Sequence, residues 1–208
     1  MDKKILAVNG GKPVLESEPE DMFHWPIVTE EDEEAVCAVL RAGKMSGTDI
    51  TKQFEKEYAA WTGAKYALAT CNGTAALQEA LWACGVCGGK EVIAPSMTYW
   101  ASCACIITLG AEINFADIQA DTLCIDPDDI EHRINERTAA IMVVHYGGYP
   151  ADMDRINAIA RRHGVKVIED VSHAQGALYK GRMCGTLGDI SATSMMGAKA
   201  FAVGEGGM

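Results

Sequence analysis

Basic residues are scarce in this 208-residue sequence. It has 18 lysines and arginines against 29 aspartates and glutamates, which gives a formal net charge of −11. A surface of that sign repels polyanions, so the balance argues against binding to nucleic acid or to an anionic membrane. A local phosphate site remains compatible with it, because a few main-chain N–H groups at the start of a helix can hold a dianion.

Long apolar runs are lacking too. No stretch is long enough to span a bilayer, and the N-terminal residues MDKKILAVNGG have no apolar core ahead of a small-residue cleavage site. The sequence therefore predicts a cytoplasmic protein with no membrane partner. In that compartment we expect the eight cysteines to be reduced thiols.

Several metal-binding and nucleotide-binding motifs are absent. Cys84 and Cys87 have C-x-x-C spacing, but no second Cys or His pair accompanies them. We therefore interpret them as inert thiols and expect no metal site. No G-x-G-x-x-G follows the first expected strand, and Gly197-Ala-Lys-Ala200 lacks the G-K-[ST] of a P-loop. The absence of these nucleotide-binding motifs argues against a dinucleotide-binding Rossmann domain.

What the sequence does contain is an alternation of strand-like and helical segments. Residues 1–28, rich in Gly and Pro, predict an irregular arm, and residues 29–208 predict one large domain. Strands are expected at 66–70, 91–94, 111–116, 139–144, 165–168 and 190–194, and helices at 29–43, 53–61, 74–84, 99–109 and 152–163. This alternation predicts an α/β fold, a three-layer αβα arrangement with a mainly parallel sheet.

Polar and aromatic residues follow the ends of the expected strands. Ligands of open α/β sheets bind beyond the carboxyl ends of the strands, so these positions are candidates for a site. The segments are Asn72-Gly-Thr-Ala75, Pro95-Ser-Met-Thr-Tyr-Trp100, His145-Tyr-Gly-Gly148 and Glu169-Asp170 with His173. We expect them to meet along one edge of the sheet.

Each candidate also has a simpler interpretation. The start of the 74–84 helix, with Gly73 and the Thr74 hydroxyl, suits a phosphate, but Thr74 could be a plain N-cap. Asp170 could cap a helix or form a salt bridge, and His173 could be a core histidine. Tyr99 and Trp100 could be core aromatics.

Lys199 stands in a small, apolar, glycine-rich stretch, with no acidic neighbour before Glu205. Desolvation favours the neutral amine, which is a nucleophile and the usual donor of a Schiff base. The alternative is a surface lysine on a flexible loop.

Six ordered segments together resemble the DegT/DnrJ/EryC1/StrS family of aminotransferases, which depend on pyridoxal 5′-phosphate (PLP) and act on keto sugars, usually as sugar nucleotides. The resemblance runs from Gly10-Gly-Lys-Pro13 almost to the last residue. The segments are CNGTAAL (71–77), PSMTYWAS (95–102), DTLCIDPDDIEHRI (121–134), VVHYGG (143–148), EDVSHAQGALYKGRMCGTLGD (169–189) and SMMGAKAFAVGEGG (194–207). It implies the large domain of a fold-type I PLP-dependent transferase.

The resemblance also implies residue roles. Lys199 would hold PLP as a Schiff base, Asp170 would pair with the pyridine nitrogen, and His173 would lie near the ring hydroxyl. Gly73, Thr74 and Ala75 would form the phosphate loop, Ser194 would add a phosphate contact, and Tyr99 would stack on the ring, with Trp100 the weaker candidate. The reaction implied is amino transfer from glutamate or glutamine to a keto sugar.

Relatives in this family are roughly twice as long, with a C-terminal small domain that is absent from this sequence. They also build each site at the interface of a homodimer. Three alternatives stay open: a fragment of a longer enzyme, a truncated PLP-binding or dimerising domain without turnover, and a PLP-dependent sugar dehydratase of the same family. Some of those dehydratases have histidine in place of the lysine, so Lys199 favours amino transfer.

Overall fold

A five-stranded parallel sheet forms the centre of the molecule. The structure is a computed structural model and describes residues 5–15, 17 and 24–208. The strand order is β2-β1-β3-β4-β7, with β1 at Glu91–Pro95, β2 at Glu112–Ala116, β3 at Thr138–Val144, β4 at Lys166–Asp170 and β7 at Ile190–Ala192. A separate antiparallel hairpin joins β5 (Leu178–Tyr179) to β6 (Arg182–Met183).

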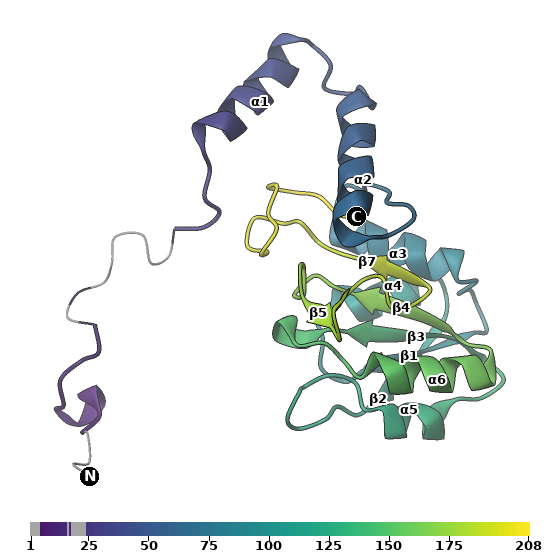
Figure 1. Cartoon of the computed structure of the whole chain (residues 1–208). Helices are drawn as coiled ribbons and strands as arrows, with labels where there is room; N and C mark the ends of the chain where they lie inside the picture. Colours follow the sequence, from purple (N-terminus) through teal and green to yellow (C-terminus); the bar gives the residue numbers. More distant parts are fainter. Residues whose placement is uncertain (1–4, 16, 18–23) are drawn as a thin grey trace.

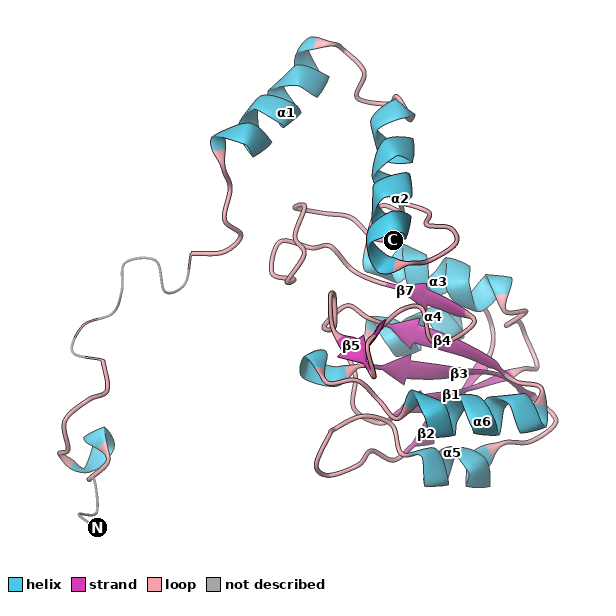
Figure 2. Cartoon of the chain, in the orientation of Figure 1, coloured by secondary structure: helices cyan, strands magenta, loops and turns pink. Residues whose placement is uncertain are grey.

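Helices cover both faces of this sheet (Figures 1 and 2). One layer holds α3 (Gly73–Ala83) and α4 (Ala101–Thr108), and the other holds α5 (Pro127–Arg133) and α6 (Met153–His163). Successive strand residues point to opposite faces, so Val92 and Ala94 pack with the α3/α4 layer and Ile93 with the α5/α6 layer. The three-layer αβα arrangement expected from the sequence is confirmed.

The sequence of α6 explains how a helix of this kind forms. Asp152 caps it by accepting a hydrogen bond from the N–H of Arg155. Its apolar side chains recur at helical spacing and are buried against the sheet: Met153, Ile156, Ile159 and Ala160. Gly164 ends it in the left-handed conformation, with φ of 67°.

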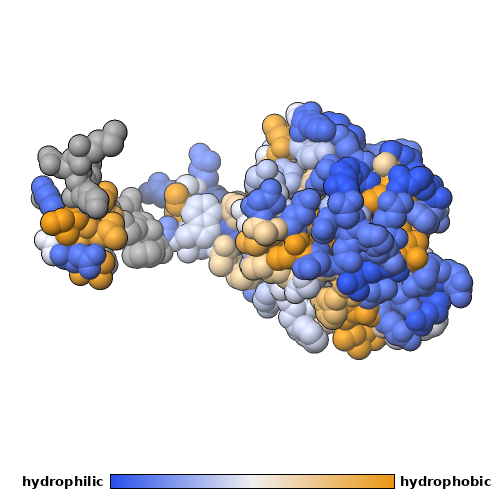
Figure 3. Space-filling view, turned by 90° about the horizontal axis from the view of Figure 1, so that it is seen from below, coloured by the Kyte–Doolittle hydropathy of each residue, from blue (hydrophilic) through white to orange (hydrophobic). Residues whose placement is uncertain are grey.

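The N-terminal segment extends away from the sheet (Figure 1). It carries a short 3-10 helix η1 (Ala7–Asn9), then α1 (Glu30–Arg41) and α2 (Asp49–Thr62). Thr29 and Asp32 form a capping box at the start of α1, which confirms the helix expected there. Neither α1 nor α2 has a buried residue. Hydrophobic surface is visible on the arm in Figure 3. The side chains of Ile5, Leu6 and Val8 are exposed.

The strand expected at residues 66–70 is wrong. Of these residues, only Thr70 forms a β-bridge, an antiparallel one with Gly207. Tyr66 and Leu68 are exposed, and the N–H of Ala69 donates to Glu55 on α2 instead of to a neighbouring strand. The apolar run is extended, but the described part of the chain offers it no strand partner, and a strand is defined by pairing.

Other expectations differ in their limits. Helix α2 begins at Asp49 rather than Gln53, and α4 begins at Ala101, which leaves Tyr99 in the preceding loop. Helix α5, the β5–β6 hairpin and the short 3-10 helix η2 (Tyr146–Gly148) were not expected. Among the described residues, no helix has the length and apolar character needed to cross a membrane.

Candidate functional site

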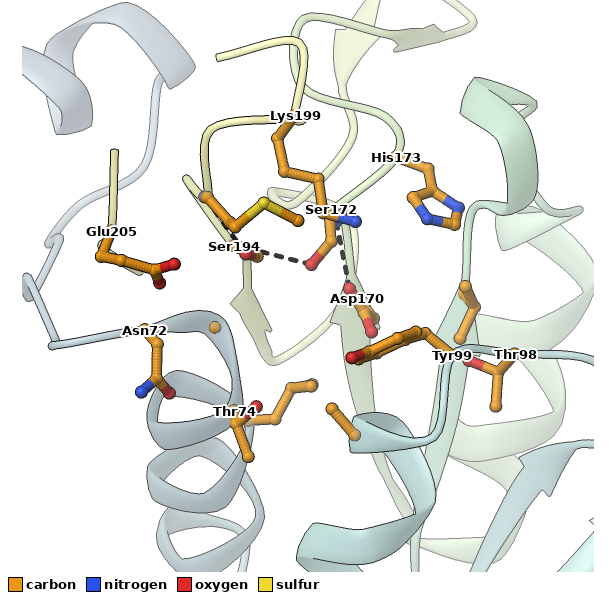
Figure 4. Close-up of a pocket in the computed structure, with 15 residues that line it drawn as sticks. Asn72, Thr74, Thr98, Tyr99, Asp170, Ser172, His173, Ser194, Lys199 and Glu205 are labelled. Atoms are coloured by element: carbon orange, nitrogen blue, oxygen red, sulfur yellow. Dashed lines mark hydrogen bonds between the residues drawn. The ribbon is translucent and has the colours of Figure 1, made fainter. Parts of the chain in front are cut away.

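A cavity of about 340 Å³ lies beyond the carboxyl end of β4, between the start of α3 and the loop that carries Lys199 (Figure 4). Its volume falls in the range of small-molecule sites. Most of the residues singled out from the sequence line it together: Gly73, Thr74, Tyr99, Asp170, His173, Ser194 and Lys199. Ala75 and Trp100 are not among the lining residues.

Asp170 is the buried carboxylate of this cavity, with 5% of its surface exposed. Its Oδ2 accepts a hydrogen bond from Ser102 Oγ at 2.9 Å, and its Oδ1 accepts one from the main-chain N–H of Ser172 at 3.0 Å. Among the described residues Asp170 forms no ion pair, so the salt-bridge interpretation is not supported. Each carboxylate oxygen can accept a further bond, which leaves capacity for a cationic donor in the cavity.

The first turn of α3 presents main-chain donors to the same cavity. Asn72, and not Thr74, is the N-cap: its side chain accepts the N–H of Ala75 at 2.9 Å. The N–H of Ala75 is therefore engaged, whereas within the described chain the N–H groups of Gly73 and Thr74 meet no acceptor. With the exposed Thr74 side chain, they form the anion-binding end of the helix.

Gly73 is required by close packing at this point. A Cβ placed on Gly73 would lie 2.6 Å from the Cβ of Ser194, closer than non-bonded carbon atoms approach. The start of α3 therefore rests directly on the segment that leads to Lys199. Ser194 in turn donates its N–H to the hydroxyl of Ser172 at 3.0 Å (Figure 4).

Lys199 is half-buried, and its side chain points into the cavity toward Ser172 and Asp170 (Figure 4). This placement favours a residue of the cavity over a surface lysine on a flexible loop. The indole N–H of Trp25, from the N-terminal segment, donates to the carbonyl of Lys199 at 2.9 Å. Lys199 and Asp170 thus lie on one side of the sheet and open to one cavity.

His173 and Tyr99 flank the opening, and neither is a core residue, since both are exposed. The His173 ring packs edge-on against Tyr146, with centroids 5.6 Å apart, and its Nδ1 accepts the N–H of Gly147 at 3.5 Å. Partial burial lowers the pKa of His173, the Lys199 cation lowers it further, and Asp170 opposes both. His173 is therefore held toward its neutral form.

Glu169, the neighbour of Asp170, points to the opposite face of the sheet. It is fully buried and accepts hydrogen bonds from His145 Nε2 at 2.9 Å and from the N–H groups of Gly185, Leu187 and Gly188. Burial alone would raise the pKa of Glu169, but the donors of His145, Gly185 and Gly188 hold it below its ordinary value. This carboxylate ties the 185–188 turn to β4.

Two serines of the site, Ser102 and Ser172, were not expected from the sequence. Ser102 reaches Asp170 from α4 and contacts the Thr98 hydroxyl at 2.8 Å, and Ser172 links Asp170 to Ser194. The Thr98–Ser102 spacing of four residues and the Asp-x-Ser pattern at 170–172 are the sequence signals that could have indicated them. Asn72 belongs to a segment singled out from the sequence, but its role as the N-cap in place of Thr74 was not expected, and the N-cap preference of asparagine is the corresponding signal.

No group of three or more His, Cys, Asp or Glu side chains in the described ranges is arranged to hold a metal ion. Burial raises the pKa of Cys84, while Cys87 is exposed. A raised pKa keeps the thiol protonated, which fits the interpretation of an inert thiol.

The profile of the DegT/DnrJ/EryC1/StrS aminotransferase family matches residues 26–208. The chain belongs to this family. The family depends on PLP. The cavity contains the three groups that such a cofactor requires, which are an amine, a carboxylate and a helix N-terminus.

Two curated relatives show the range of the similarity. The spore coat polysaccharide biosynthesis protein SpsC of Bacillus subtilis is 44% identical over 89% of this chain and 48% of its own length. The L-glutamine:2-deoxy-scyllo-inosose aminotransferase of Streptomyces kanamyceticus is 39% identical over 97% of this chain and 48% of its own length. The chain thus spans about half the length of the curated relatives it matches.

A solved structure gives the same picture. The Streptococcus pneumoniae protein Spr1654 in its PLP form has a TM-score of 0.84 and 32% identity, over 88% of this chain and 50% of that chain. A form with pyridoxamine phosphate is also known for it. The likeness supports the fold and the cofactor class at the same time.

Proposed function

We propose that this protein is part of a PLP-dependent aminotransferase that moves an amino group from glutamate or glutamine to a keto sugar, with a nucleotide-linked sugar as the substrate. One observation carries the proposal: Lys199, Asp170 and the open end of α3 line a single cavity. An amine, a buried carboxylate and a phosphate-binding helix end are the groups that PLP requires.

Different residues of the cavity would hold different parts of the cofactor. Asp170 would accept a hydrogen bond from the protonated pyridine nitrogen and so keep that nitrogen protonated, with its two oxygens oriented by Ser102 and Ser172. The N–H groups of Gly73 and Thr74 would hold the phosphate, with Ser194 beside them and Ala75 behind in the same turn. Tyr99 would stack on the ring.

Bound PLP supplies an electron sink that stabilises negative charge at the carbon of the amino donor. Lys199 would bind the cofactor covalently through Nζ. Once released from that bond, Nζ would move a proton between the donor Cα and the cofactor C4′. A base held in this way typically contributes about 10²–10⁴-fold to the rate. His173, near the ring hydroxyl, would remain neutral; because its Nδ1 accepts the N–H of Gly147, its Nε2–H would donate to the ring oxygen.

The proposed substrate class is inferred from the names of two relatives. The Streptomyces relative is named for a glutamine donor and a cyclic polyhydroxy ketone, and SpsC for polysaccharide biosynthesis. The first name states amino transfer from glutamine to such a ketone, and the second states only a role in making a polysaccharide. For this chain we propose the same donor class and a keto sugar acceptor.

A second copy of the chain is the proposed partner. The apolar side chains Val36 and Leu40 of α1 are exposed, as are those of the arm, and exposed apolar patches mark interaction surfaces. The eight cysteines are free thiols, which supports a reducing compartment, and we propose the cytoplasm.

The test is to load the protein with PLP, reduce it with borohydride and locate the added mass by peptide mass spectrometry. We expect the mass on the peptide that contains Lys199, and Lys199→Ala should abolish both this label and the visible absorbance of the bound cofactor. Lys65→Ala, at an exposed lysine outside the cavity, serves as the control and should label like the wild type. A full label in Lys199→Ala would overturn the proposal.

A further inference from the structure

The side chain of Gln175 bridges the two ends of the loop that carries Lys199. Its Nε2 donates to the carbonyl of Ser194 at 2.7 Å and to the hydroxyl of Thr193 at 2.9 Å. Its Oε1 accepts the main-chain N–H of Phe201 at 2.8 Å. Ser194 lies five residues before Lys199, and Phe201 lies two residues after it.

The orientation of this amide is fixed by its partners. The carbonyl of Ser194 can only accept a hydrogen bond, and the N–H of Phe201 can only donate one. The nitrogen of Gln175 must therefore face Ser194 and its oxygen must face Phe201. A side chain of the same length that lacked either the donor or the acceptor could serve only one end of the loop.

The loop is also held from the segment that bears Asp170. Ser172 accepts the N–H of Ser194, and Gln175 donates to the carbonyl of the same residue. Both polar main-chain groups of Ser194 are thus bound by the short stretch that follows Asp170. The residues that follow Asp170 therefore position both the Asp170 carboxylate and Ser194, where the loop that carries Lys199 begins.

Beyond Lys199, the loop is packed against α2. The ring of Phe201 stacks on Trp61, with centroids 5.7 Å apart, and on Phe54 at 6.3 Å. This packing fixes the ring of Phe201, while Gln175 fixes its backbone. Together they limit how far the Cα of Lys199 can move relative to Asp170.

We propose that Gln175 is a positioning residue that sets the reach of Lys199 Nζ toward the carbonyl carbon of PLP. The inference rests on the function proposed above. Gln175 does not line the cavity, and the hydrogen bonds of Asp170 to Ser102 and Ser172 do not involve its side chain. Noncovalent retention of PLP is then preserved, whereas the fraction of PLP joined to Lys199 falls.

The experiment compares Gln175→Met with the wild type in two measurements on the full chain at saturating PLP. The first is total bound cofactor after rapid gel filtration, and the second is the borohydride-fixed label on the Lys199 peptide. We expect total PLP to remain similar and the fixed fraction to fall about fivefold to tenfold, as the loss of one or two net hydrogen bonds would give. Gln78→Met, at an exposed position of α3, is the matched control and should label like the wild type.

Gln175→Glu provides a second readout that a loss of folding would not imitate. Its carboxylate keeps an acceptor for Phe201 but turns an oxygen toward the carbonyl of Ser194. Protonation restores a donor, so the fixed fraction relative to the wild type should rise as the pH is lowered from about 8 to about 4, through the ordinary glutamate pKa of about 4.3.

The inference is overturned if Gln175→Met labels like the Gln78 control, or if the Gln175→Glu ratio does not change with pH. If the wild type itself carries no label on Lys199, the proposed function fails, and the inference fails with it. A wild type labelled on Lys199 beside an unaffected Gln175→Met would remove only the inference.

Discussion

At the scale of single residues, the site is a set of charges that influence one another. Asp170 is buried with two neutral donors, and Lys199 shares its cavity. His173 senses both, because its pKa is lowered first by partial burial and then by Lys199, while Asp170 acts in the opposite direction. The protonation of His173 therefore reports on the charge of the cavity.

Replacing Lys199 should change the pKa of His173. In Lys199→Ala without PLP, the pKa of His173 should rise toward its ordinary value of about 6.5, and stop short of it because partial burial remains. NMR titration of the His173 ring would measure the shift. Lys65→Ala, outside the cavity, should leave the titration of His173 unchanged. An identical titration in the wild type and in Lys199→Ala would show that the amine is too far away to act.

The residues that the sequence predicted best are those with distinctive chemistry. A single lysine in a glycine-rich stretch and an aspartate at a strand end lie in the cavity as expected. The sequence could not predict the roles of Ser102, Ser172 and Gln175, because serine and glutamine are common in loops and helices. Their contacts depend on how α4, β4 and the lysine loop meet in three dimensions.

At the scale of elements, the site depends on the contact between the start of α3 and Ser194. The sequence pattern predicted the helix at 74–84 and the strand at 190–194. It could not indicate that the start of this helix contacts Ser194 at Gly73. It also overestimated residues 66–70, since an apolar run carries no information on whether a partner strand is present. Pairing is a property of the sheet rather than of the segment.

Gly73→Ala tests this contact. The added methyl would lie 2.6 Å from the Cβ of Ser194, so α3 or the Ser194 segment must shift. We expect a loss of stability of about 1–3 kcal/mol, as for overpacking in a core. Weaker binding of PLP should accompany it, since the phosphate donors move away. Thermal denaturation and a spectroscopic titration with PLP would measure the two effects.

Gly88→Ala is the matched control for this substitution. Its nearest neighbour would be the carbonyl oxygen of Gly110, at an ordinary contact distance of 3.8 Å. Stability and PLP affinity should stay close to those of the wild type. Equal effects at both glycines would contradict the packing argument.

At the scale of the whole molecule, the N-terminal helices differ from the α/β body. Helix α1 has a well-formed capping box but buries none of its residues, and it stands away from the sheet (Figure 1). Val36 and Leu40 are four residues apart and so lie on one face of α1. An amphipathic helix of this kind gains most of its stability by packing.

If α1 packs on a second copy, polar substitutions on that face should weaken the dimer. We expect the double substitution Val36→Ser and Leu40→Ser to raise the dimer dissociation constant at least about tenfold, because apolar surface is no longer removed from water. Light scattering after gel filtration over a dilution series would measure it. Glu34→Gln, an exposed change on the same helix, should leave the constant unaltered, and an unchanged dimer in the double variant would exclude this face.

The alternation along β4 places Glu169 under one layer of helices and Asp170 in the cavity on the other side. A one-residue insertion between α6 and β4 that moved the strand by a single step would bring Glu169 to the position of Asp170 and Ile168 to the position of Glu169. Four hydrogen-bond donors would then face no acid in the interior, and a different acid would stand at the cavity. Activity and folding would be lost together, so the spacing between Gly164 and Asp170 should tolerate substitution far better than a change in length.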